Sequence, residues 1–520
     1  MAGQLTFSTS RDTESPNFFL ITLSDKDDHY CYGGNARYNC VWDNKTGWSY
    51  SENFCIYELD PGCYHYTISA GSEWTFVFGS VEIGRNENRK LNFSLERIFN
   101  RKAMGLCAAD SHVHSWRGRQ VDDFETIFKA GGIDFAGIQY WGLYSDRESV
   151  ELPPAKNPFK IGNTWVSTDE EIEMDSPWCD YEDSSIIGLK EKIPDIRSGI
   201  GYRMNSRFYQ VARKKNCRLI IYQSPTWSQF PVDVVLGYVD SVNICDNFFS
   251  LRQPNNGPWE YTCFGAEDIK QKKPFGIAHF VFERYYLFLN AGFQIAVSGG
   301  SAYPTGGGGG PVGMNRFYVY DHNDDNPDSF YNAWKEGRTF ATNGPLILAE
   351  VDGNPPSSRP ITQKKREARL SVQIYSNKPI KRIEWIGDGN VIAGKYIESK
   401  ICPQNIIWEA KLDLRRYHWV AARCFGESER IFFSKGGKVS PPFLTAHTSP
   451  FYMESFGSNC EVRKEAIFEI VQHFEWMQAV VQGQVSSPFA TRFRKVSLLS
   501  NREKDEIIET IHDARSVFRQ

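Results

Sequence analysis

The stretch Met104-Gly105-Leu106-Cys107-Ala108-Ala109-Asp110-Ser111-His112-Val113-His114 passes from an apolar run into a polar one within a few residues. Its apolar half predicts a buried strand. Because alternate side chains of a strand share a face, Asp110, His112 and His114 are predicted to point the same way. Two imidazoles and a carboxylate close together are natural ligands for zinc or a similar divalent ion, which lowers the pKa of bound water. Two core or loop histidines with local hydrogen bonds would give the same pattern.

The chain before this stretch has the pattern of a small all-β unit. A turn is predicted at Leu59-Asp60-Pro61-Gly62, because Pro presets φ and Gly tolerates positive φ. Period-two patterns separated by turns predict a β-sandwich over residues 1–103. The alternating apolar positions are Tyr64, Tyr66 and Ile68, and later Leu91, Phe93 and Leu95.

The chain after residue 103 mixes strand and helix patterns. Leu219-Ile220-Ile221-Tyr222 has the pattern of a buried strand. Residues 280–290 have that of a helix, and residues 295–298 that of the strand after it. Alternation of strands and helices predicts an α/β layer or barrel over residues 104–345.

Two further units follow the predicted barrel. Alternation around the turn Gly387-Asp388-Gly389-Asn390 predicts a second β-sandwich over residues 346–450. Residues 451–520 are predicted to be helical, because apolar residues recur there at helical spacing. The residues with this spacing are Ile467, Val471, Phe474, Met477 and Val481, followed by Ile507, Ile508 and Ile511.

The composition bounds the function. The 520 residues are too many for one hydrophobic core, and a net charge of −4 offers no attraction to nucleic acid or to an anionic membrane. We find no apolar run of about 18 residues and no secretory signal. We therefore expect a cytoplasmic protein whose 12 Cys are mostly buried thiols. In an exported protein, Cys31, Cys40, Cys55 and Cys63 would be free to pair instead.

The segment Ala109-Asp110-Ser111-His112-Val113-His114 resembles the opening strand of the CehA/McbA metallohydrolases, which are similar to the PHP (polymerase and histidinol phosphatase) superfamily. Four later stretches resemble the same family in the same order, so the resemblance covers about residues 100 to 460. These stretches are residues 285–293, the glycine-rich 298–302 with 311–319, the closing element 334–345, and Ala446-His447-Thr448-Ser449-Pro450.

The resemblance implies a distorted (β/α) barrel of PHP type, flanked by an N-terminal and a C-terminal β-sandwich, with helices at the end of the chain. It implies that metal-activated water hydrolyses an amide, ester or carbamate bond of a small-molecule substrate. Zinc and manganese are the expected ions. Neither nucleic acid nor a membrane is expected as a partner, and a homo-oligomer stays open.

The chain departs from the family at three ligand positions. Gln139, Ser224 and Ala302 stand where better-equipped members carry metal-ligating Asp or His residues. The site is then reduced to one ion, or filled by other residues, or no longer catalytic. In the last case the barrel would be a binding protein for a small molecule or a carbohydrate that stacks on aromatic rings.

Other side chains are candidates for the missing ligands. Glu171 and Glu173 share a face if residues 169–173 end a strand, and a solvated acidic loop is the alternative. Asp240 ends an apolar stretch, where barrel sites collect polar groups, or it caps a turn. Arg316 clamps a substrate carboxylate or forms an ion pair inside the barrel.

The predicted site has three groups of residues. The predicted metal ligands are Asp110, His112, His114 and Glu171, and the predicted catalytic residues are Asp240 and Arg316. The glycine run 306–310 is expected to lie close to a ligand or to act as a lid, and His447 to be structural. The predicted substrate-binding residues are Gln139, Trp141, Gln223, Trp227, Ser301 and Asn315.

Overall fold

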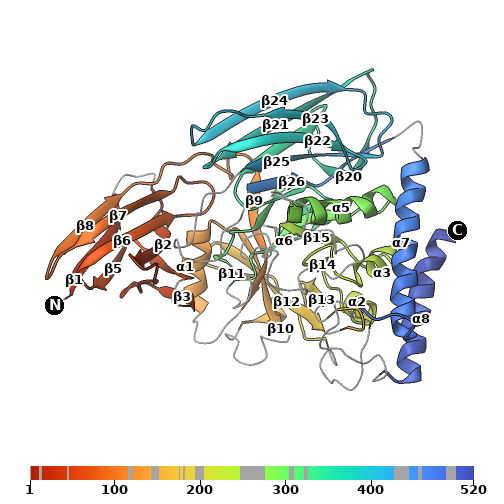
Figure 1. Ribbon diagram of the computed structural model, residues 1–520, viewed down its shortest axis with the longest axis horizontal. Coiled ribbons are helices and arrows are strands. Elements are labelled where there is room, and N and C mark those ends of the chain that lie inside the picture. The colour runs from red at the N-terminus through yellow and green to blue at the C-terminus, as the bar shows by residue number, and fades with distance from the viewer. Residues whose placement is uncertain are drawn as a thin grey trace.

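The computed structural model combines several β-sheets with helices. Figure 1 shows one group of strands at the N-terminal end, a second group above the centre, and two long helices beside the centre. The residues described are 2–10, 15–43, 46–114, 121–141, 152–174, 176–179, 182–193, 204–245, 276–303, 310–320, 326–426, 444–454, 460–487 and 499–519.

The first part of the chain forms two sheets around one core. Its strands are β1 (Gly3–Thr9), β2 (Phe18–Asp25), β3 (Tyr38–Asp43), β4 (Thr46–Glu52), β5 (Phe54–Leu59), β6 (Gly62–Ser69), β7 (Val77–Ile83) and β8 (Asn88–Phe93). One sheet has the order β5–β1–β8 and the other β3–β4–β2–β6–β7. Phe7 of β1 and Phe19 of β2 lie in the same buried cluster, so both sheets contribute to this core.

The central part of the chain builds a curved run of strands. In spatial order they are β16 (Ala296–Gly299), β15 (Ser241–Cys245), β14 (Leu219–Tyr222), β13 (Glu182–Ile187), β12 (Thr164–Met174), β10 (Phe135–Trp141), β9 (Leu106–His114), β17 (Arg316–Tyr320) and β18 (Thr339–Thr342). The short β11 (Phe159–Ile161) pairs with β12. All neighbouring pairs from β9 to β16 are parallel except the two that involve β13. The carboxyl ends of β9, β10, β12, β14, β15 and β16 therefore lie at one edge.

Strands β16 and β9 approach each other without forming a continuous ladder of main-chain hydrogen bonds. The Ser111 hydroxyl of β9 donates to the Gly299 carbonyl of β16 at 3.0 Å. His114 N–H donates to the Tyr303 carbonyl at 2.6 Å, and Val113 and Tyr303 form an isolated bridge. Among the described residues there is thus no closed barrel. The mixed α/β class with several sheets agrees with the prediction.

The two faces of β9 pack against different neighbours. Helix α1 (Val121–Gly131) covers the outer face, where Phe124 packs in one cluster with Ala108 of β9 and Leu20 of β2. Helix α6 (Pro327–Lys335) fills the inner face near the amino ends of the strands. There the Phe330 ring stacks on Phe135 of β10 at 4.1 Å. Apolar packing at this end leaves polar residues for the other end of the interior.

The last strands continue the central sheet and add a small one. They are β19 (Leu346–Val351), β20 (Ser357–Ile361), β21 (Ala368–Ser376), β22 (Ile380–Gly387), β23 (Asn390–Tyr396), β24 (Gln404–Leu412), β25 (Trp419–Gly426), β26 (Leu444–Thr448) and β27 (Phe451–Met453). The order β18–β26–β25–β22–β23 extends the central sheet, and β19–β21–β24 form a separate sheet. These strands account for the all-β pattern predicted over residues 346–450.

His447 joins β26 to helix α5 (Gly276–Asn290). Its Nδ1 lies 2.6 Å from the Thr448 carbonyl, and its Nε2 lies 2.6 Å from the Tyr286 hydroxyl of α5. Burial lowers the pKa of His447 to about 3. The ring is therefore neutral: Nδ1 donates to the carbonyl and Nε2 accepts from Tyr286. These contacts agree with the structural role expected for His447.

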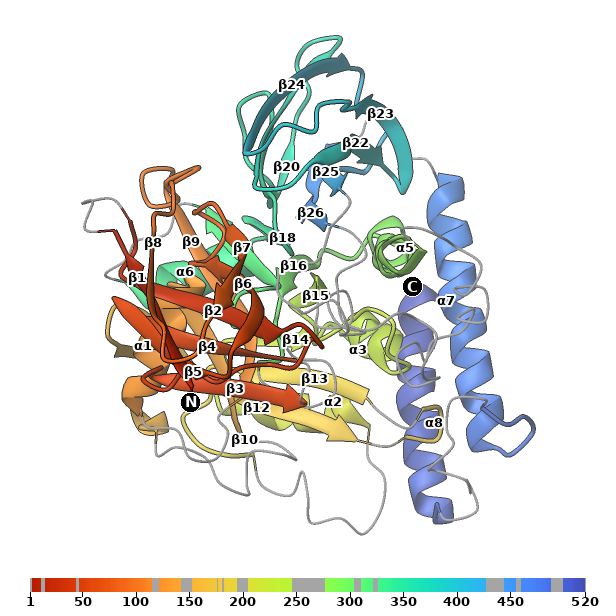
Figure 2. The ribbon, with the colours of Figure 1, turned by 60° about the vertical axis from the view of Figure 1, so that its left-hand side comes forward.

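The C-terminal helices pack side by side against the central part, as Figures 1 and 2 both show. They are α7 (Cys460–Val481) and α8 (Asn501–Ser516), and short 3₁₀ turns lie at Pro154–Lys156 and Val517–Arg519. Phe474, Met477 and Val481 of α7 are buried, as their spacing predicts. The Trp178 indole N–H donates to the Met477 carbonyl at 2.9 Å and ties α7 to the centre.

The remaining helices are α2 (Asn205–Lys214) and α3 (Phe230–Val235), which lie over the outer face of β13 and β14. No helix in the described ranges has both the length and the apolar character needed to cross a membrane. The ten cysteines whose state is described are free thiols, and most of them are buried. Cys31, Cys40, Cys55 and Cys63 are among these free thiols and do not pair.

Glu182 is a fully buried carboxyl on the outer face of β13. It accepts hydrogen bonds from the Ser176 hydroxyl and the Gln229 N–H, both at 3.3 Å. Burial raises the pKa of Glu182 from its usual 4.5 to about 7, although these hydrogen bonds oppose the shift. The carboxyl is therefore protonated in the folded protein at pH values where it ionises in the unfolded chain.

This difference predicts a pH-dependent stability. Below the unfolded pKa near 4.5 both states hold the proton. Between that pH and about 7 only the unfolded state loses it, so rising pH destabilises the fold by about 3 kcal/mol in total. The substitution Glu182→Gln removes this dependence. Denaturant unfolding at pH 4 to 8 should show that the free energy of unfolding of the variant increases relative to that of the natural protein as pH rises.

The exposed Glu398 provides the control, since Glu398→Gln changes a carboxyl that lies in water. Its difference from the natural protein should stay within about 0.5 kcal/mol at every pH. A Glu182→Gln profile parallel to the natural one would contradict the shifted pKa.

Candidate metal centre

A bulge in β9 decides which way its polar side chains point. Asp110 and Val113 pair with two β10 residues that have only one residue between them, so β9 carries one extra residue. An extra residue reverses the alternation of side chains beyond it. Val113 accordingly packs in the outer cluster with α1, whereas His112 and His114 face the interior.

Asp110 lies on the outer side of this bulge. Its carboxylate accepts from Ser301 N–H at 3.0 Å, from the Ser301 hydroxyl at 2.5 Å and from Gly313 N–H at 2.8 Å. Burial raises the pKa of Asp110, and these hydrogen bonds oppose the shift. The prediction that Asp110 converges with the histidines on a metal is wrong, because the bulge turns it away. Ser301, predicted to bind substrate, holds Asp110 instead.

His112, His114 and Glu171 form a compact buried group. The two Nε2 atoms are 3.0 Å apart, and His112 Nε2 lies 2.8 Å from Glu171 Oε1. His114 Nδ1 lies 3.7 Å from Glu171 Oε2. Each residue offers one ligand atom within 4.8 Å of those of the other two, and all three are at most 3% exposed. Three of the four predicted ligands are therefore brought together.

Glu171 reaches the histidines across an intervening strand. It lies on β12, and β10 separates β12 from β9. Nearer the start of β10, Gly137 lies opposite Ser167 of β12, and a Cβ there would lie 2.7 Å from Asp169 Oδ2 and 2.9 Å from the Ser111 carbonyl. The missing side chain leaves room for the Asp169 carboxylate. The alternative of a solvated acidic loop is wrong, since residues 169–173 are buried in a strand.

Burial keeps His112 neutral. Desolvation lowers its pKa, while the charges of Asp183 and Asp110 and a hydrogen bond with Gln223 oppose the shift. A neutral imidazole keeps a lone pair on one nitrogen, which is the form that binds a cation. The position of Gln223 beside His112 agrees with its predicted place in the site.

A chain of side-chain hydrogen bonds crosses the interior at the level of His112. The Gln223 amide donates to the Ser185 hydroxyl at 2.6 Å, and Asn243 donates to Gln223. The Ser111 hydroxyl donates to Asn243 Oδ1 at 3.0 Å. Gln139, another predicted site residue, donates from Nε2 to the Ser111 carbonyl at 3.2 Å. These amides join β13, β14, β15, β9 and β10.

Two residues of this interior were missed in the sequence. Asn243 stands inside the apolar strand β15, and Asp183 is the second residue of the buried strand β13. A polar residue that interrupts an apolar strand was the available signal for Asn243. Asp183 had no such signal, because its strand is antiparallel and brings its first residues, not its last, to the polar edge.

The predicted substrate-binding residues at the other positions differ in their surroundings. Trp141 is half-buried at the end of β10, with its ring 5.3 Å from that of Tyr140. Asn315 is fully buried directly before β17. Trp227 is fully buried in the main apolar cluster with Phe230. The prediction that Trp227 stacks on a ligand is therefore wrong, because core side chains surround its ring.

Asp240 lies at the opposite end of the strands. It directly precedes β15, at the amino edge, and its carboxylate contacts Arg213 at 2.5 Å and Lys335 at 3.0 Å. It also accepts from Ile220 N–H at 2.8 Å. The prediction of a catalytic Asp240 is wrong, because Asp240 begins a strand whose carboxyl end lies at the site. Its role is to pair two cations.

Arg316 also faces away from the interior. Its guanidinium donates to the carbonyls of Gly313 at 2.5 Å, Gly131 at 2.8 Å and Gly132 at 3.3 Å. Gly131 and Gly132 end helix α1, where carbonyls without helical partners attract a cation. The alternative of an ion pair for Arg316 finds no carboxylate partner among the described residues, whereas its role as a clamp for a substrate carboxylate stays a prediction.

Two further expectations fall on residues outside the described ranges. They are the lid formed by the glycine run 306–310, of which only Gly310 is described, and stacking of a ligand on the aromatic ring of Trp116, one of the rings expected to suit a carbohydrate. Within the described ranges one other group has metal-ligand spacing, formed by Asp25, Asp27 and His29. A local turn explains it, because Asp25 Oδ1 accepts from the N–H groups of Asp27 and His29, both at 2.8 Å.

Comparison of the chain with protein-family models and with curated proteins found no match. The resemblance to the CehA/McbA metallohydrolases therefore stays a prediction.

The close approach of β16 to β9 predicts the effect of one methyl group. A Cβ at Gly300 would lie 2.5 Å from His112 Cβ and 3.0 Å from Asn243 Nδ2. We expect Gly300→Ala to push His112 aside and to destabilise the fold by about 1–3 kcal/mol, as overpacking does. Denaturant unfolding measures this loss.

Gly394→Ala is the matched control, since a Cβ there meets nothing closer than 3.8 Å. That variant should stay within about 0.5 kcal/mol of the natural protein. Equal stability of the two variants would show that Gly300 is not packed against His112.

Proposed function

We propose that this chain is a metal-dependent hydrolase that holds one divalent ion on His112, His114 and Glu171. The observation that carries the proposal is the convergence of two imidazoles and a carboxylate within 4.8 Å in a buried place. Buried polar groups cost free energy unless they are paired, and a divalent cation pairs with all three at once. The ion would supply activated water for amide, ester or carbamate hydrolysis.

The ligand spacing supports a small ion with nitrogen and oxygen ligands. Tetrahedral ligands at ~2.0–2.2 Å from zinc lie about 3.3–3.5 Å from one another. His112 Nε2 lies 3.0 Å from His114 Nε2 and 2.8 Å from Glu171 Oε1, so small outward shifts of these side chains would admit the ion. Zinc and manganese both accept imidazole with carboxylate, and two nitrogens against one oxygen favour zinc.

One ion rather than two is supported by what surrounds the ligands. Gln139, Gln223 and Asn243 occupy the neighbouring inner positions, and amides bind cations more weakly than carboxylates do. The amide N–H groups of all three already donate to neighbours, which are the Ser111 carbonyl, the Ser185 hydroxyl and Gln223. This matches the loss of family ligands at Gln139, Ser224 and Ala302.

The remaining interior side chains suit an amide or carbamate substrate. Gln139 Oε1 is buried and accepts no hydrogen bond from the described part of the chain, so it can accept one from a substrate N–H. Asp183 is buried on β13, and its negative charge raises the pKa of His112. We assign to its carboxylate the proton that the attacking water gives up.

The finer fold assignment belongs to the same proposal. We assign the run from β9 to β16 to the distorted PHP-type barrel, and the β-rich parts on either side to sandwiches. The support is the contact of β16 with β9, through Ser111 and Gly299, which brings the ends of the run together.

The second candidate function is a binding protein for a neutral small molecule. The observation in its favour is the amide layer of Gln139, Gln223 and Asn243, which suits hydrogen bonding more than catalysis. Under this alternative the histidines hold no ion.

The metal proposal predicts a loss of zinc affinity in ligand variants. His112→Ala, His114→Ala and Glu171→Gln should each weaken zinc binding by more than about 100-fold, since even indirect contacts to a metal are worth 10–100-fold. The exposed His65 on β6 provides the control variant, His65→Ala. Elemental analysis and zinc titration of the purified proteins measure the effect. Zinc binding of equal strength in all four variants would refute the site.

Catalysis separates the two candidate functions. Chromogenic anilides, carbamates and esters are incubated with the zinc-loaded and manganese-loaded protein. We expect turnover of the anilide or carbamate, lost in His114→Ala and reduced by about 10²–10⁴-fold in Asp183→Asn, because a positioned base contributes that much. Saturable binding without turnover and without metal would favour the binding protein.

A further inference from the structure

An inner pocket lies where the three β-rich parts of the chain meet. Its walls are the β6–β7 connection, the end of α1 with the segment before β17, and the β21–β22 connection. Two hydrogen bonds fix these walls. The Ser72 hydroxyl lies 2.6 Å from the Tyr318 hydroxyl, and the Asn377 amide donates to the Trp74 carbonyl at 2.7 Å. The pocket is on the outer side of β9, away from the proposed metal centre.

Arg316 lines this pocket with a buried positive charge. It is 5% exposed, and its hydrogen bonds go to the carbonyls of Gly131, Gly132 and Gly313. No carboxylate in the described part of the chain forms an ion pair with it, and burial lowers its pKa, although the charge of Asp110 and the Tyr318 side chain oppose the shift. A buried cation without a counter-charge is costly, so the pocket favours an anion. With the Tyr318 side chain as a further partner, four of the five guanidinium N–H groups are used, which leaves one as a donor.

A basic groove leads outward from the pocket. The two cavities share Phe76, Asn377 and Lys378, and the groove also has Lys381 and Lys400 in its walls. Among the described residues that line either cavity there is no Asp or Glu. Four cations thus follow one path in a chain whose net charge is −4. A cleft lined by one sign of charge concentrates ligands of the opposite sign.

Apolar groups accompany these charges. Leu20, Met314 and Leu444 line the inner pocket, and the Phe78 ring stands 69% exposed at the groove. The Lys378 amine lies 5.4 Å from the centre of that ring. A ligand that satisfies both features is an anion with an apolar body.

We propose that this pocket and groove form a binding site for a small organic carboxylate with an aliphatic or aromatic chain. The carboxylate lies in the inner pocket against Arg316 and Lys378, and the chain lies along Phe76 and Phe78. The free volume is about 50 Å³ in the pocket and about 500 Å³ in the groove. A water needs ~10–15 Å³ on this measure, so the pocket holds a headgroup of a few heavy atoms.

The site does not depend on the metal centre. Arg316 and the metal ligands lie on opposite sides of the β9 sheet, so the site serves as a second binding site whatever reaction the interior performs. The His112→Ala variant should therefore bind the carboxylate as tightly as the natural protein does. A result that refutes the metal centre would not refute this binding site.

Calorimetric titration of the full chain with sodium octanoate tests the site. We expect saturable binding to one site, at least about tenfold tighter than 1-octanol, because charge-assisted hydrogen bonds are absent with the alcohol. Octyltrimethylammonium has a similar chain with a positive headgroup and should not bind. Equal affinities for octanoate and octanol would overturn the proposal, since the pocket would then be merely apolar, and so would the absence of octanoate binding.

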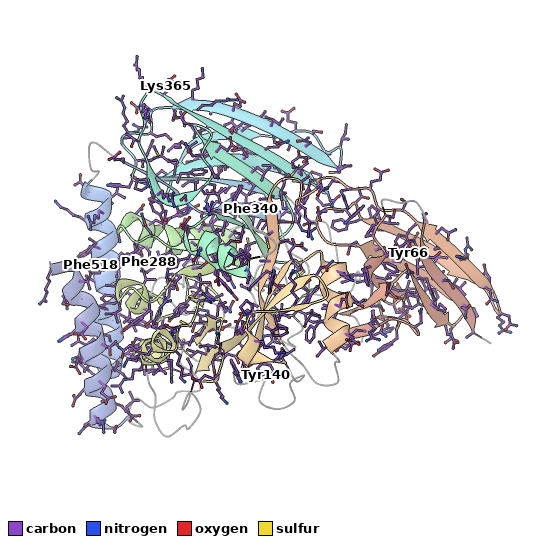
Figure 3. The ribbon with its side chains drawn as sticks, turned by 180° about the vertical axis from the view of Figure 1, so that it is seen from behind. Tyr66, Tyr140, Phe288, Phe340, Lys365 and Phe518 are labelled. Atoms are coloured by element: carbon purple, nitrogen blue, oxygen red, sulfur yellow. The ribbon has the colours of Figure 1, made fainter. Side chains whose placement is uncertain are left out.

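Substitutions place the binding in this pocket. Lys378→Glu reverses the charge at the junction of pocket and groove and should weaken octanoate binding at least about tenfold. Lys365→Glu makes the same change at the outer tip of the C-terminal strands, where Figure 3 labels this residue, and should have no effect. Equal affinity in the two variants would overturn the proposal. Arg316→Gln should also weaken binding, and if that variant does not fold, Lys378→Glu decides.

Discussion

One extra residue in β9 is the constraint on which the rest of the architecture depends. The bulge between Asp110 and Val113 gives one strand polar side chains on both faces. Asp110 is directed outward, where it holds Ser301 and Gly313. His112 is directed inward, where it meets Glu171. A regular strand would have sent all these side chains to one face and left the segments around β16 and β17 without their anchor.

Polar packing in the interior is possible because glycines let the chain approach closely. Gly137 keeps β10 clear of Asp169, and Gly300 passes His112 where a Cβ would stand 2.5 Å from another carbon atom. Amide side chains then connect five strands through Ser111, Gln223 and their neighbours. Each bond contributes about 1 kcal/mol, but an unpaired buried amide would cost more than that. The network therefore specifies which strands are neighbours, beyond what apolar contacts decide.

Local patterns predicted the strand and helix elements better than they predicted the contacts between them. The apolar run before Asp110 identified β9, and helical spacing identified α7 and α8. The grouping of His112, His114 and Glu171 followed from residue type and strand position. Asp110 could not be placed, because a bulge has no fixed sequence pattern.

Asp240 and Arg316 could not be placed because their partners come from distant segments. The carboxylate of Asp240 meets Arg213 and Lys335, and the guanidinium of Arg316 meets main-chain carbonyls at the end of α1. Every residue type has a main-chain carbonyl, so no sequence motif predicts which carbonyls will accept a hydrogen bond from Arg316. Whether a polar residue lies at the carboxyl or the amino edge depends on strand direction, which is set by the connections between strands.

The line along which β16 meets β9 has a mechanical consequence. Elsewhere in the sheet, continuous ladders resist separation, but among the described residues this line is held by the Ser111 contact with Gly299, the hydrogen bonds between Asp110 and Ser301, and the bridge at Tyr303. At about 1 kcal/mol for each contact, thermal fluctuation parts this line far more often than it parts a ladder. The sheet around the interior is thus expected to open locally at this line, and the backbone amides along it are expected to exchange with solvent first.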